Sequence, residues 1–427
     1  MTGYLLLVAL IALYALGASR LEYLMITGPI AFVVLGFILG PTVTSVVELG
    51  PSSELVRIVT GVTLALLLFS DASSINLAAL RRDASVVTRL LFIGLPLAVV
   101  FGAVSGWLLL PALGLGVCAL LASILAPTDL SLGLAMFKNP NVPERVRRAI
   151  NVESGLNDGV ATPVVTIFIG VAIAEASTLE HPMVTAIEEL LIGLGIGILV
   201  GAVGGVLMQL SARHQWSSVA SRQFAGLSFA LLAYGGAIAL EGNGFIAAFV
   251  GGMAFGAVNH QGASEAVRYT EKAGVLMTFG VWYIFGATIA PILISDDLSW
   301  QPIVYALVSL TVVRMLAVAI SLLGKKMHWS TLLFIGWFGP RGLASVVFLI
   351  LSLQSLDEAG VETSMLVATA GWTILLSVIL HGLSAGPVAA WYGSRSARFA
   401  PGSPELEATQ VVKTRHGIAS PSSYADD

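Results

Sequence analysis

The sequence predicts an all-α polytopic membrane protein, and its composition and the length of its apolar segments support this. Of its 427 residues, 56% are hydrophobic and only 11% are charged, and the mean hydropathy is +0.90. A soluble domain has about 25% charged residues. About thirteen apolar stretches are long enough to cross a bilayer, which takes roughly 20 residues each. Two of these stretches are interrupted by proline and glycine, which points to a more specific architecture.

The expected spans follow one another up to about residue 392. They centre near Ala12, Phe32, Thr63, Ala98, Leu125, Ile167, Gly195, Leu231, Phe249, Tyr283, Leu307, Leu343 and Leu375. The first span lacks the positively charged start of a signal peptide, so we expect it to stay in the membrane. Residues 1–392 are therefore expected to form one transmembrane domain. Residues 393–427, rich in Ser, Pro and Ala, are expected to form a short, disordered cytoplasmic tail.

Basic residues alternate between the connections and predict the orientation. The odd-numbered connections and the tail carry Arg20, Arg81, Arg82, Arg89, Lys138, Arg145, Arg147, Arg148, Arg213, Arg222, Arg268, Lys272, Lys325, Lys326, Arg395, Arg398, Lys413 and Arg415. The even-numbered connections carry none apart from Arg57, just past the second one. The positive-inside rule then places the C-terminus in the cytoplasm and the N-terminus outside. We expect an integral protein of the plasma (inner) membrane.

Two of the expected spans are interrupted near their midpoints. The fifth carries Ala126-Pro127-Thr128-Asp129, and the twelfth carries Gly336-Trp337-Phe338-Gly339-Pro340-Arg341-Gly342. Proline and glycine break the hydrogen-bond ladder of a helix, and in lipid the freed backbone groups must face a cavity or other protein. Because five and twelve differ by seven, the two segments run in opposite directions. This predicts an inverted repeat of spans 1–6 and 8–13 whose two broken helices cross at the midplane, where transporters bind substrate.

The sixth span carries a carboxylate, Asp158, in an apolar surrounding. An ionisable group inside the membrane costs roughly 2.5–3.5 kcal/mol or more, so it indicates an ion or proton site. Helical spacing places Ser154 one turn before Asp158 and Glu153 one turn before Asn157, which builds an oxygen-rich face. Desolvation favours the protonated carboxyl group, and a proton and a cation exclude each other on one carboxylate. The alternative is a polar pair that only holds helices together.

The interrupted segments have a functional and a structural interpretation. Thr128 and Asp129 can add oxygens to the ion site. Alternatively, the threonine caps a proline kink, and Asp129 caps the second half-helix at its positive end. Arg341 needs a partner inside the membrane, and we expect Glu153 to form that ion pair. The alternative is that Arg341 only neutralises the carbonyl groups at the end of a half-helix.

Three further polar residues lie in expected spans. Asp71 ends the third span and is a doubtful ligand, because a solvated helix cap explains it equally well. Arg314, in the eleventh span, has no evident partner in the sequence and is interpreted as structural. His381, in the last span, is favoured as a structural histidine over a proton relay.

Several classes of protein are disfavoured. The sequence contains no GxxxxGK[ST] run, so transport would be driven by a gradient and not by a nucleotide. Cys118 is the only cysteine, which excludes a disulfide or a thiolate metal cluster within one chain. We expect no cofactor, no nucleotide or nucleic-acid partner and no enzymatic activity.

The motifs Ala126-Pro127-Thr128-Asp129, Glu153-Ser154-Gly155-Leu156-Asn157-Asp158-Gly159 and Phe338-Gly339-Pro340-Arg341-Gly342 can be compared with known families. Together, and in this order, they resemble those of the monovalent cation/proton antiporter superfamily, nearest its NhaP-type and sodium/hydrogen exchanger branch. The resemblance covers nearly the whole chain. It implies a core domain that moves against a dimerisation domain, in a homodimer embedded in lipid.

The resemblance also implies roles for single residues. Asp158 would be the ion-binding carboxylate beside Asn157, with oxygens from Asp129, Thr128 and Ser154. Glu153 and Arg341 would form a buried ion pair. Members with Asn before the aspartate resemble electroneutral exchangers. Several relatives have a glutamate directly after the phenylalanine of the third span, whereas here Ser70 follows Phe69, which leaves Asp71 in doubt.

We therefore expect a secondary active antiporter that exchanges Na⁺ for H⁺ at Asp158 by alternating access, electroneutrally and one for one, in pH homeostasis. Because the same oxygens serve K⁺ or Li⁺, a K⁺/H⁺ antiporter is the alternative. A cation channel is disfavoured, since channels line a pore with rings of carbonyls or charges. An intramembrane hydrolase built on His381 and Ser345 has no supporting spacing.

Overall fold

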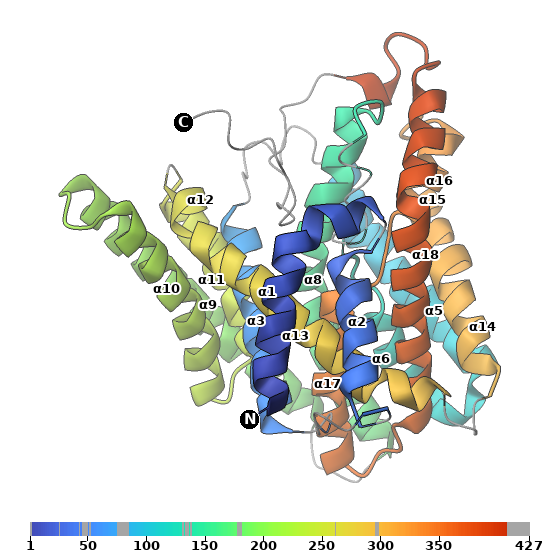
Figure 1. Cartoon of the computed structure of the whole chain (residues 1–427), viewed down its shortest axis with the longest axis horizontal. Helices are drawn as coiled ribbons and strands as arrows, with labels where there is room; N and C mark the ends of the chain where they lie inside the picture. The colour runs from blue at the N-terminus through green and yellow to red at the C-terminus, as the bar shows by residue number, and fades with distance from the viewer. Residues whose placement is uncertain are drawn as a thin grey trace.

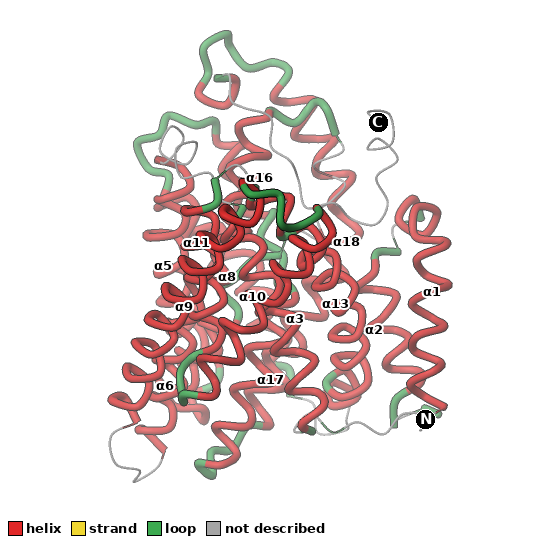
Figure 2. The backbone as a smooth tube through the Cα atoms, turned by 90° about the vertical axis from the view of Figure 1, so that its left-hand side faces the viewer, coloured by secondary structure: helices red, strands yellow, loops and turns green. Residues whose placement is uncertain are grey.

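A computed structural model describes most of the chain. It covers residues 2–24, 26–41, 43–44, 50, 53–74, 85–129, 132, 136, 139–176, 182–260, 262–294 and 299–407. The described elements are helices, and none of them is a strand (Figure 2). Some features used for the orientation lie outside the described residues: Arg81, Arg82, Lys138, Lys413, Arg415 and the connections near Ser45, Glu180 and Ser295.

The helical elements follow the expected spans along the chain. They are α1 (Thr2–Tyr23), α2 (Gly28–Leu39), α3 (Glu54–Ser73), η1 (Leu90–Gly94), α5 (Leu95–Leu109), η2 (Pro111–Leu113), α6 (Gly114–Ile124), α8 (Glu144–Ala176), α9 (Pro182–Arg213), α10 (Val219–Ala239), α11 (Gly244–Val258), α12 (Ala263–Ala266), α13 (Arg268–Thr288), η4 (Ala290–Ile294), α14 (Gln301–Val308), η5 (Ser309–Val313), α15 (Arg314–Ser321), α16 (Trp329–Trp337), α17 (Leu343–Glu358), α18 (Ser364–Ser396) and η6 (Pro404–Leu406). Within the described ranges, 7 helices are long and apolar enough to cross a membrane, and shorter apolar helices accompany them. An all-α membrane protein is therefore confirmed.

Most of the long helices run in roughly the same direction and lie side by side (Figure 1). α11 packs against α9 and α3, and α13 packs against α2 and α3. On the other side, α6 packs between α5 and α8, and α14 packs against α18. Glycine allows the closest approach: a Cβ atom on Gly201 of α9 would lie 2.1 Å from the carbonyl oxygen of Gly251 in α11. Small residues at such contacts are typical of membrane helices.

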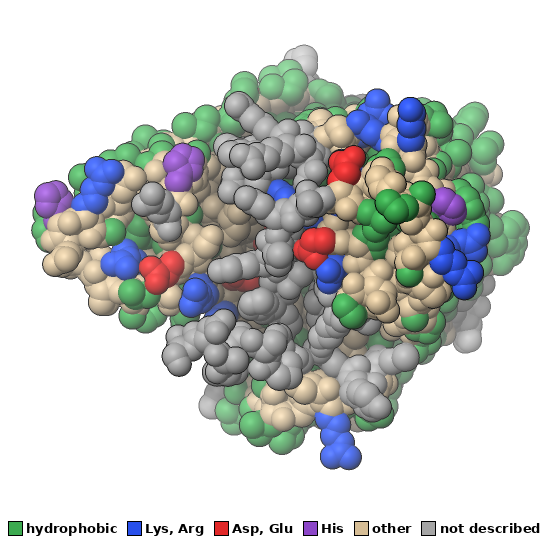
Figure 3. Space-filling model, turned by 90° about the horizontal axis from the view of Figure 1, so that it is seen from above, with side chains coloured by type: hydrophobic (Ala, Val, Ile, Leu, Met, Phe, Trp, Pro, Cys, Tyr) green, Lys and Arg blue, Asp and Glu red, His purple; other side chains and the backbone are tan. Residues whose placement is uncertain are grey.

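The distribution of side chains on the surface fits a protein embedded in lipid. In the view from above in Figure 3, Lys and Arg side chains dot the face, and hydrophobic side chains form much of its rim. α9 has the most exposed long apolar segment of the 7, with 28% of its apolar window buried. Its leucines Leu191, Leu199 and Leu207 are more than half exposed. This surface suits lipid or a second apolar partner.

The two expected interruptions coincide with helix ends. α6 ends at Ile124, and the chain is not helical from Leu125 to Asp129. Of residues 130–138 only Leu132 and Met136 are described, so the course of the rest of this segment lies outside the described residues. The other interruption is complete: α16 ends at Trp337, and α17 begins at Leu343.

The segment after the last span returns to the bundle. α18 continues to Ser396, past the boundary expected at residue 392. Glu405, in η6, is buried and accepts hydrogen bonds from the backbone N–H of His328 at 2.6 Å and from Thr331 Oγ1 at 2.9 Å. The described part of the tail, up to residue 407, is therefore folded. The disorder expected of residues 408–427 concerns residues outside the described part.

Candidate functional site

The carboxylate singled out by the sequence lies on a buried face of α8. Glu153, Ser154, Asn157 and Asp158 are all buried, and their relative exposure does not exceed 9%. The spacing of four residues places Ser154 below Asp158 and Glu153 below Asn157, as the sequence predicts. The first half of α8 therefore places the oxygen atoms of four polar side chains in the interior of the protein.

The non-helical segment after α6 lies against this face. The Ser154 hydroxyl donates to the carbonyl oxygen of Thr128 at 2.7 Å, and Asn157 Nδ2 donates to Thr128 Oγ1 at 2.6 Å. Thr128 is itself buried, with 1% exposure. Thr128, Ser154 and Asn157, which were expected to share a site, are therefore brought together. Their hydrogen bonds fix the amide of Asn157 so that its nitrogen faces Thr128.

Two oxygens on α8 are left with unused bonding capacity. Asn157 Oδ1 and Asp158 Oδ1 are both buried, and neither has a hydrogen-bond partner. Buried polar atoms are usually satisfied, and an exception requires an explanation such as an ion. The two oxygens belong to adjacent residues, and both are acceptors that a cation could satisfy. On the carboxylate, a proton is the alternative to the cation.

Asp129 joins the two interrupted segments. Its backbone N–H donates to the carbonyl oxygen of Pro340 at 2.8 Å, and its Oδ2 accepts from the backbone N–H of Leu343 at 3.1 Å. Leu343 is the first residue of α17, so the carboxylate lies at the positive end of that helix. Asp129 is thus a helix cap, but of α17, in the other interrupted segment. Gly342 makes this approach possible, because a Cβ there would lie 2.1 Å from Asp129 Cβ.

The expected ion pair of Glu153 with Arg341 is wrong. Glu153 pairs with Arg314, and the distance between Arg314 Nη2 and Glu153 Oε2 is 3.0 Å. Arg341 Nη1 instead donates to the carbonyl oxygen of Ala126 at 2.9 Å, and its Nη2 donates to that of Ser309 at 3.4 Å. The physical reason lies in the carbonyl groups that interrupted helices leave free, which need a donor in a dry interior. Arg341 meets that need, and this leaves Arg314 for Glu153.

Arg314 was interpreted from the sequence as structural, but its partner, Glu153, was not recognised. It directly follows η5, a π-helical turn, and begins α15. A π-helical turn contains one residue more than an α-helical turn. It therefore changes the direction in which the side chains that follow it point. No pattern in Ser309–Val313 announces the turn. The only available signal was a charged residue inside an apolar span, which always needs a partner.

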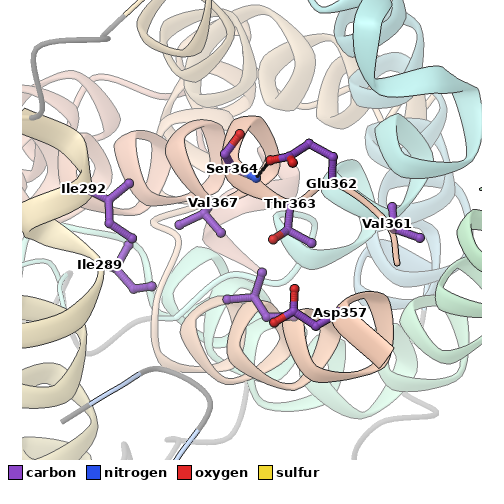
Figure 4. A pocket seen from close by; sticks show the side chains of 9 residues that line it. Ile289, Ile292, Asp357, Val361, Glu362, Thr363, Ser364 and Val367 are labelled. Carbon is purple, nitrogen blue, oxygen red and sulfur yellow. Dashed lines mark hydrogen bonds between the residues drawn. The ribbon is translucent and has the colours of Figure 1, made fainter. Parts of the chain in front are cut away.

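Asp71 lies in the last turns of α3 and is partly exposed. Its predicted role as a doubtful ligand stays a prediction. The cavity of about 380 Å³ in Figure 4 lies elsewhere, between the end of α17, the start of α18 and η4. Asp357 and Glu362 line it, but none of the predicted site residues does. The candidate ion site is therefore distinct from this cavity.

Comparison with known proteins gives a consistent result. The sequence matches the family model described as "Sodium/hydrogen exchanger, transmembrane" over residues 6–391. It is 26% identical over 278 residues to the K⁺/H⁺ antiporter NhaP of Alkalimonas amylolytica, which covers 64% of this chain and 46% of that protein. It is 27% identical over 289 residues to the Na⁺/H⁺ antiporter NhaP of Pseudomonas aeruginosa, which covers 64% of this chain and 65% of that protein. Each match thus spans less than two thirds of the relative's own length.

The fold has a solved counterpart. It is similar to the structure of the sodium proton antiporter MjNhaP1 from Methanocaldococcus jannaschii at pH 8, with a TM-score of 0.72. The similarity covers 92% of this chain and 98% of that chain, at 21% sequence identity. At this identity the similarity shows a shared fold.

Proposed function

The chain belongs to the sodium/hydrogen exchanger family, and from this premise we propose that it is a secondary active antiporter that exchanges a monovalent cation for a proton. The observation that carries the proposal is the pair of buried, unpartnered oxygens, Asn157 Oδ1 and Asp158 Oδ1. Oxygen atoms are the ligands that hard cations prefer. Because the same carboxylate can bind a proton, occupation by one ion displaces the other, and exchange follows.

Each residue of the site has a distinct proposed role. Asp158 alternates between proton and cation. Asn157, held by its hydrogen bond to Thr128, turns its oxygen towards the ion and does not titrate. Ser154 and Thr128 add neutral oxygens, and Asp129 adds negative charge while it stays bound to α17. With one titrating group in the adjacent pair, one proton is exchanged for one cation, and transport is electroneutral.

Sodium is the proposed cation, and potassium is the second candidate. The cited relatives carry both names, since one is a Na⁺/H⁺ antiporter and the other a K⁺/H⁺ antiporter. Carboxylate, amide and hydroxyl oxygens bind either ion. A direct comparison of the two cations is therefore part of the test below.

The proposed architecture has about thirteen spans, with spans 1–6 and 8–13 as inverted repeats and two interrupted helices that cross. The contact of Asp129 with Pro340 and Leu343 supports the crossing. The N-terminus is proposed to lie outside and the C-terminus in the cytoplasm of the plasma membrane, from the alternation of basic residues. The exposed leucines of α9 support a homodimer embedded in lipid.

The purified protein in proteoliposomes tests this function. A preformed pH gradient should collapse when Na⁺, K⁺ or Li⁺ is added, at a rate that saturates with the cation. Asp158→Asn should abolish the effect and leave the protein folded, since the amide keeps the shape and removes the titrating charge. Asp357→Asn, at the exposed end of α17, is the matched control and should exchange normally. Cation-dependent proton flux in Asp158→Asn would refute the proposal.

A further inference from the structure

Side chains of a third helix, α18, contact the backbone at the break between α16 and α17. Within the break, Arg341 has a backbone N–H that no longer belongs to a helical ladder. At the end of α16, the carbonyl of Trp337 has no helical partner four residues on. It accepts from the backbone N–H of Gly339 at 2.8 Å, which leaves a second lone pair for another donor. α18 passes both groups and presents two polar side chains one turn apart, Ser377 and His381, which are both buried.

These two side chains bridge the break. Ser377 Oγ accepts from the backbone N–H of Arg341 at 2.6 Å. His381 Nε2 lies 2.9 Å from the carbonyl oxygen of Trp337. A carbonyl oxygen can only accept, and the Ser377 hydroxyl can donate to Nδ1, so the neutral ring is assigned the tautomer with its proton on Nε2, which donates to Trp337. The other ring nitrogen, Nδ1, lies 3.2 Å from Ser377 Oγ and 3.0 Å from the Ser377 carbonyl oxygen. A continuous chain of polar contacts thus runs from Arg341 through Ser377 and His381 to Trp337.

The ring of His381 is also fixed by packing. It lies 5.0 Å from the Trp337 ring, centroid to centroid. The Trp337 indole Nε1 in turn donates to Ser384 Oγ, one turn further along α18, at 2.9 Å. These two contacts, together with the hydrogen bond between Thr331 Oγ1 and Tyr392 Oη at 2.9 Å, tie α16 to α18. Only the first, through His381, reaches the backbone of the break.

The break is directly connected to the proposed ion site. Arg341 lies between Pro340, whose carbonyl accepts from the Asp129 N–H, and Gly342, whose α-carbon faces Asp129. The Arg341 guanidinium group also holds the carbonyl of Ala126. A shift of this backbone therefore moves the segment 126–129, which carries Thr128 and Asp129.

We propose that His381, together with Ser377, is a positioning residue that sets the affinity for the transported cation by clamping the α16–α17 break against α18. Neither side chain touches the ion. Both act through Arg341 and Pro340 on Asp129 and Thr128. The inference rests on the antiport proposed above.

The test is a separation of KM from kcat in proteoliposomes, with sodium and potassium as the probe cations. His381→Ala should raise the cation KM about tenfold, the effect expected of one lost hydrogen bond, and should change kcat much less. His381→Gln keeps an N–H donor that can reach Trp337 and should restore most of the affinity. Ser384→Ala, which removes the hydrogen bond from the Trp337 indole to α18 and does not touch the backbone of the break, should leave KM unchanged.

The outcomes separate the two proposals. If the wild-type protein exchanges neither cation, the proposed antiport fails, whatever the variants do. If the wild type exchanges and His381→Ala has the wild-type KM, or if Ser384→Ala raises KM equally, the inference about His381 is overturned alone. Should His381→Ala not purify as a folded protein, Ser377→Ala carries the test. It keeps the ring and removes the acceptor for Arg341, so an unchanged KM in that variant overturns the inference.

Discussion

Glu153 of α8 and Arg314 of α15 form a buried ion pair, with Oε2 and Nη2 3.0 Å apart and both side chains almost completely removed from solvent. Removing two charges from water costs free energy, and the attraction between them offsets this cost only while both partners are present. The pair links α8, which carries Asp158, to the helix that follows the π-helical turn η5. It therefore belongs to the scaffold of the proposed ion site.

Removing one partner of this pair should be strongly destabilising. Arg314→Gln or Glu153→Gln alone should lower the free energy of unfolding by about 3–5 kcal/mol, because the remaining charge is left uncompensated. The double variant Glu153→Gln, Arg314→Gln should recover much of that loss. Thermal unfolding of the detergent-purified variants measures the coupling.

The matched control uses the other buried arginine. Glu153→Gln combined with Arg341→Gln should show losses that add, since Arg341 holds the carbonyls of Ala126 and Ser309 and not Glu153. Coupling between Glu153 and Arg341 together with additivity between Glu153 and Arg314 would contradict the pairing described here.

Gly342 should tolerate no side chain. A Cβ at this position would lie 2.1 Å from Asp129 Cβ and 2.4 Å from its Oδ2, so Gly342→Ala must push Asp129 away from the start of α17. We expect exchange in proteoliposomes to fall at least about tenfold, as misplacing a positioned group by an ångström commonly costs more than that. Gly386→Ala in α18 is the control, because its Cβ would meet nothing within 4 Å. Equal activity in the two variants would count against the crossing contact.

The folded tail should contribute to stability. Glu405 is buried and satisfies the backbone N–H of His328 and the hydroxyl of Thr331. Glu405→Ala leaves the His328 N–H unpaired, while Thr331 keeps its hydrogen bond to Tyr392 Oη, and the change should cost about 1–3 kcal/mol of unfolding free energy. Glu407→Ala, which removes the largely exposed carboxylate that Arg145 meets at 2.6 Å, should cost less than about 1 kcal/mol. Thermal unfolding compares the two, and a larger loss for Glu407→Ala would show that the docking of η6 is unimportant.

The parts of the site that the sequence predicted are those with local causes. Proline and glycine at 126–129 and 336–342 marked the places where helices end. The spacing of four residues on α8 predicted which oxygens share a face. A cap was one of two interpretations of Asp129, and the carboxylate does lie at a helix N-terminus, although not that of the second half-helix for which the cap was considered.

The parts that the sequence did not predict depend on how distant segments meet. Asp129 caps α17 and not a helix of its own segment, since the two interrupted segments cross there. The predicted partner of Glu153, Arg341, was wrong. The π-helical turn before Arg314 determines how α15 is rotated, and that turn has no sequence signature. The proposed role of His381 depends on the tertiary packing that brings the carbonyl oxygen of Trp337, at the end of α16, next to α18. The tail up to residue 407 looked disordered because its composition is polar, yet the buried carboxylate of Glu405 and the ion pair of Glu407 with Arg145 hold it to the bundle.

The central claim is that a single carboxylate, Asp158, exchanges one proton for one cation. Position 157 is Asn, so the adjacent pair has one titrating group, and each half-cycle moves the same net charge. A membrane potential of 100 mV would act on any uncompensated charge with about 2.3 kcal/mol. The most direct measurement is the sodium-driven exchange rate in proteoliposomes with the potential clamped by potassium and valinomycin, alongside the current on a solid-supported membrane. The exchange rate should not change with potential, and no steady current should flow. A steady current whose sign follows the sodium gradient would mean that more than one proton moves per cation, and would contradict the single-carboxylate mechanism.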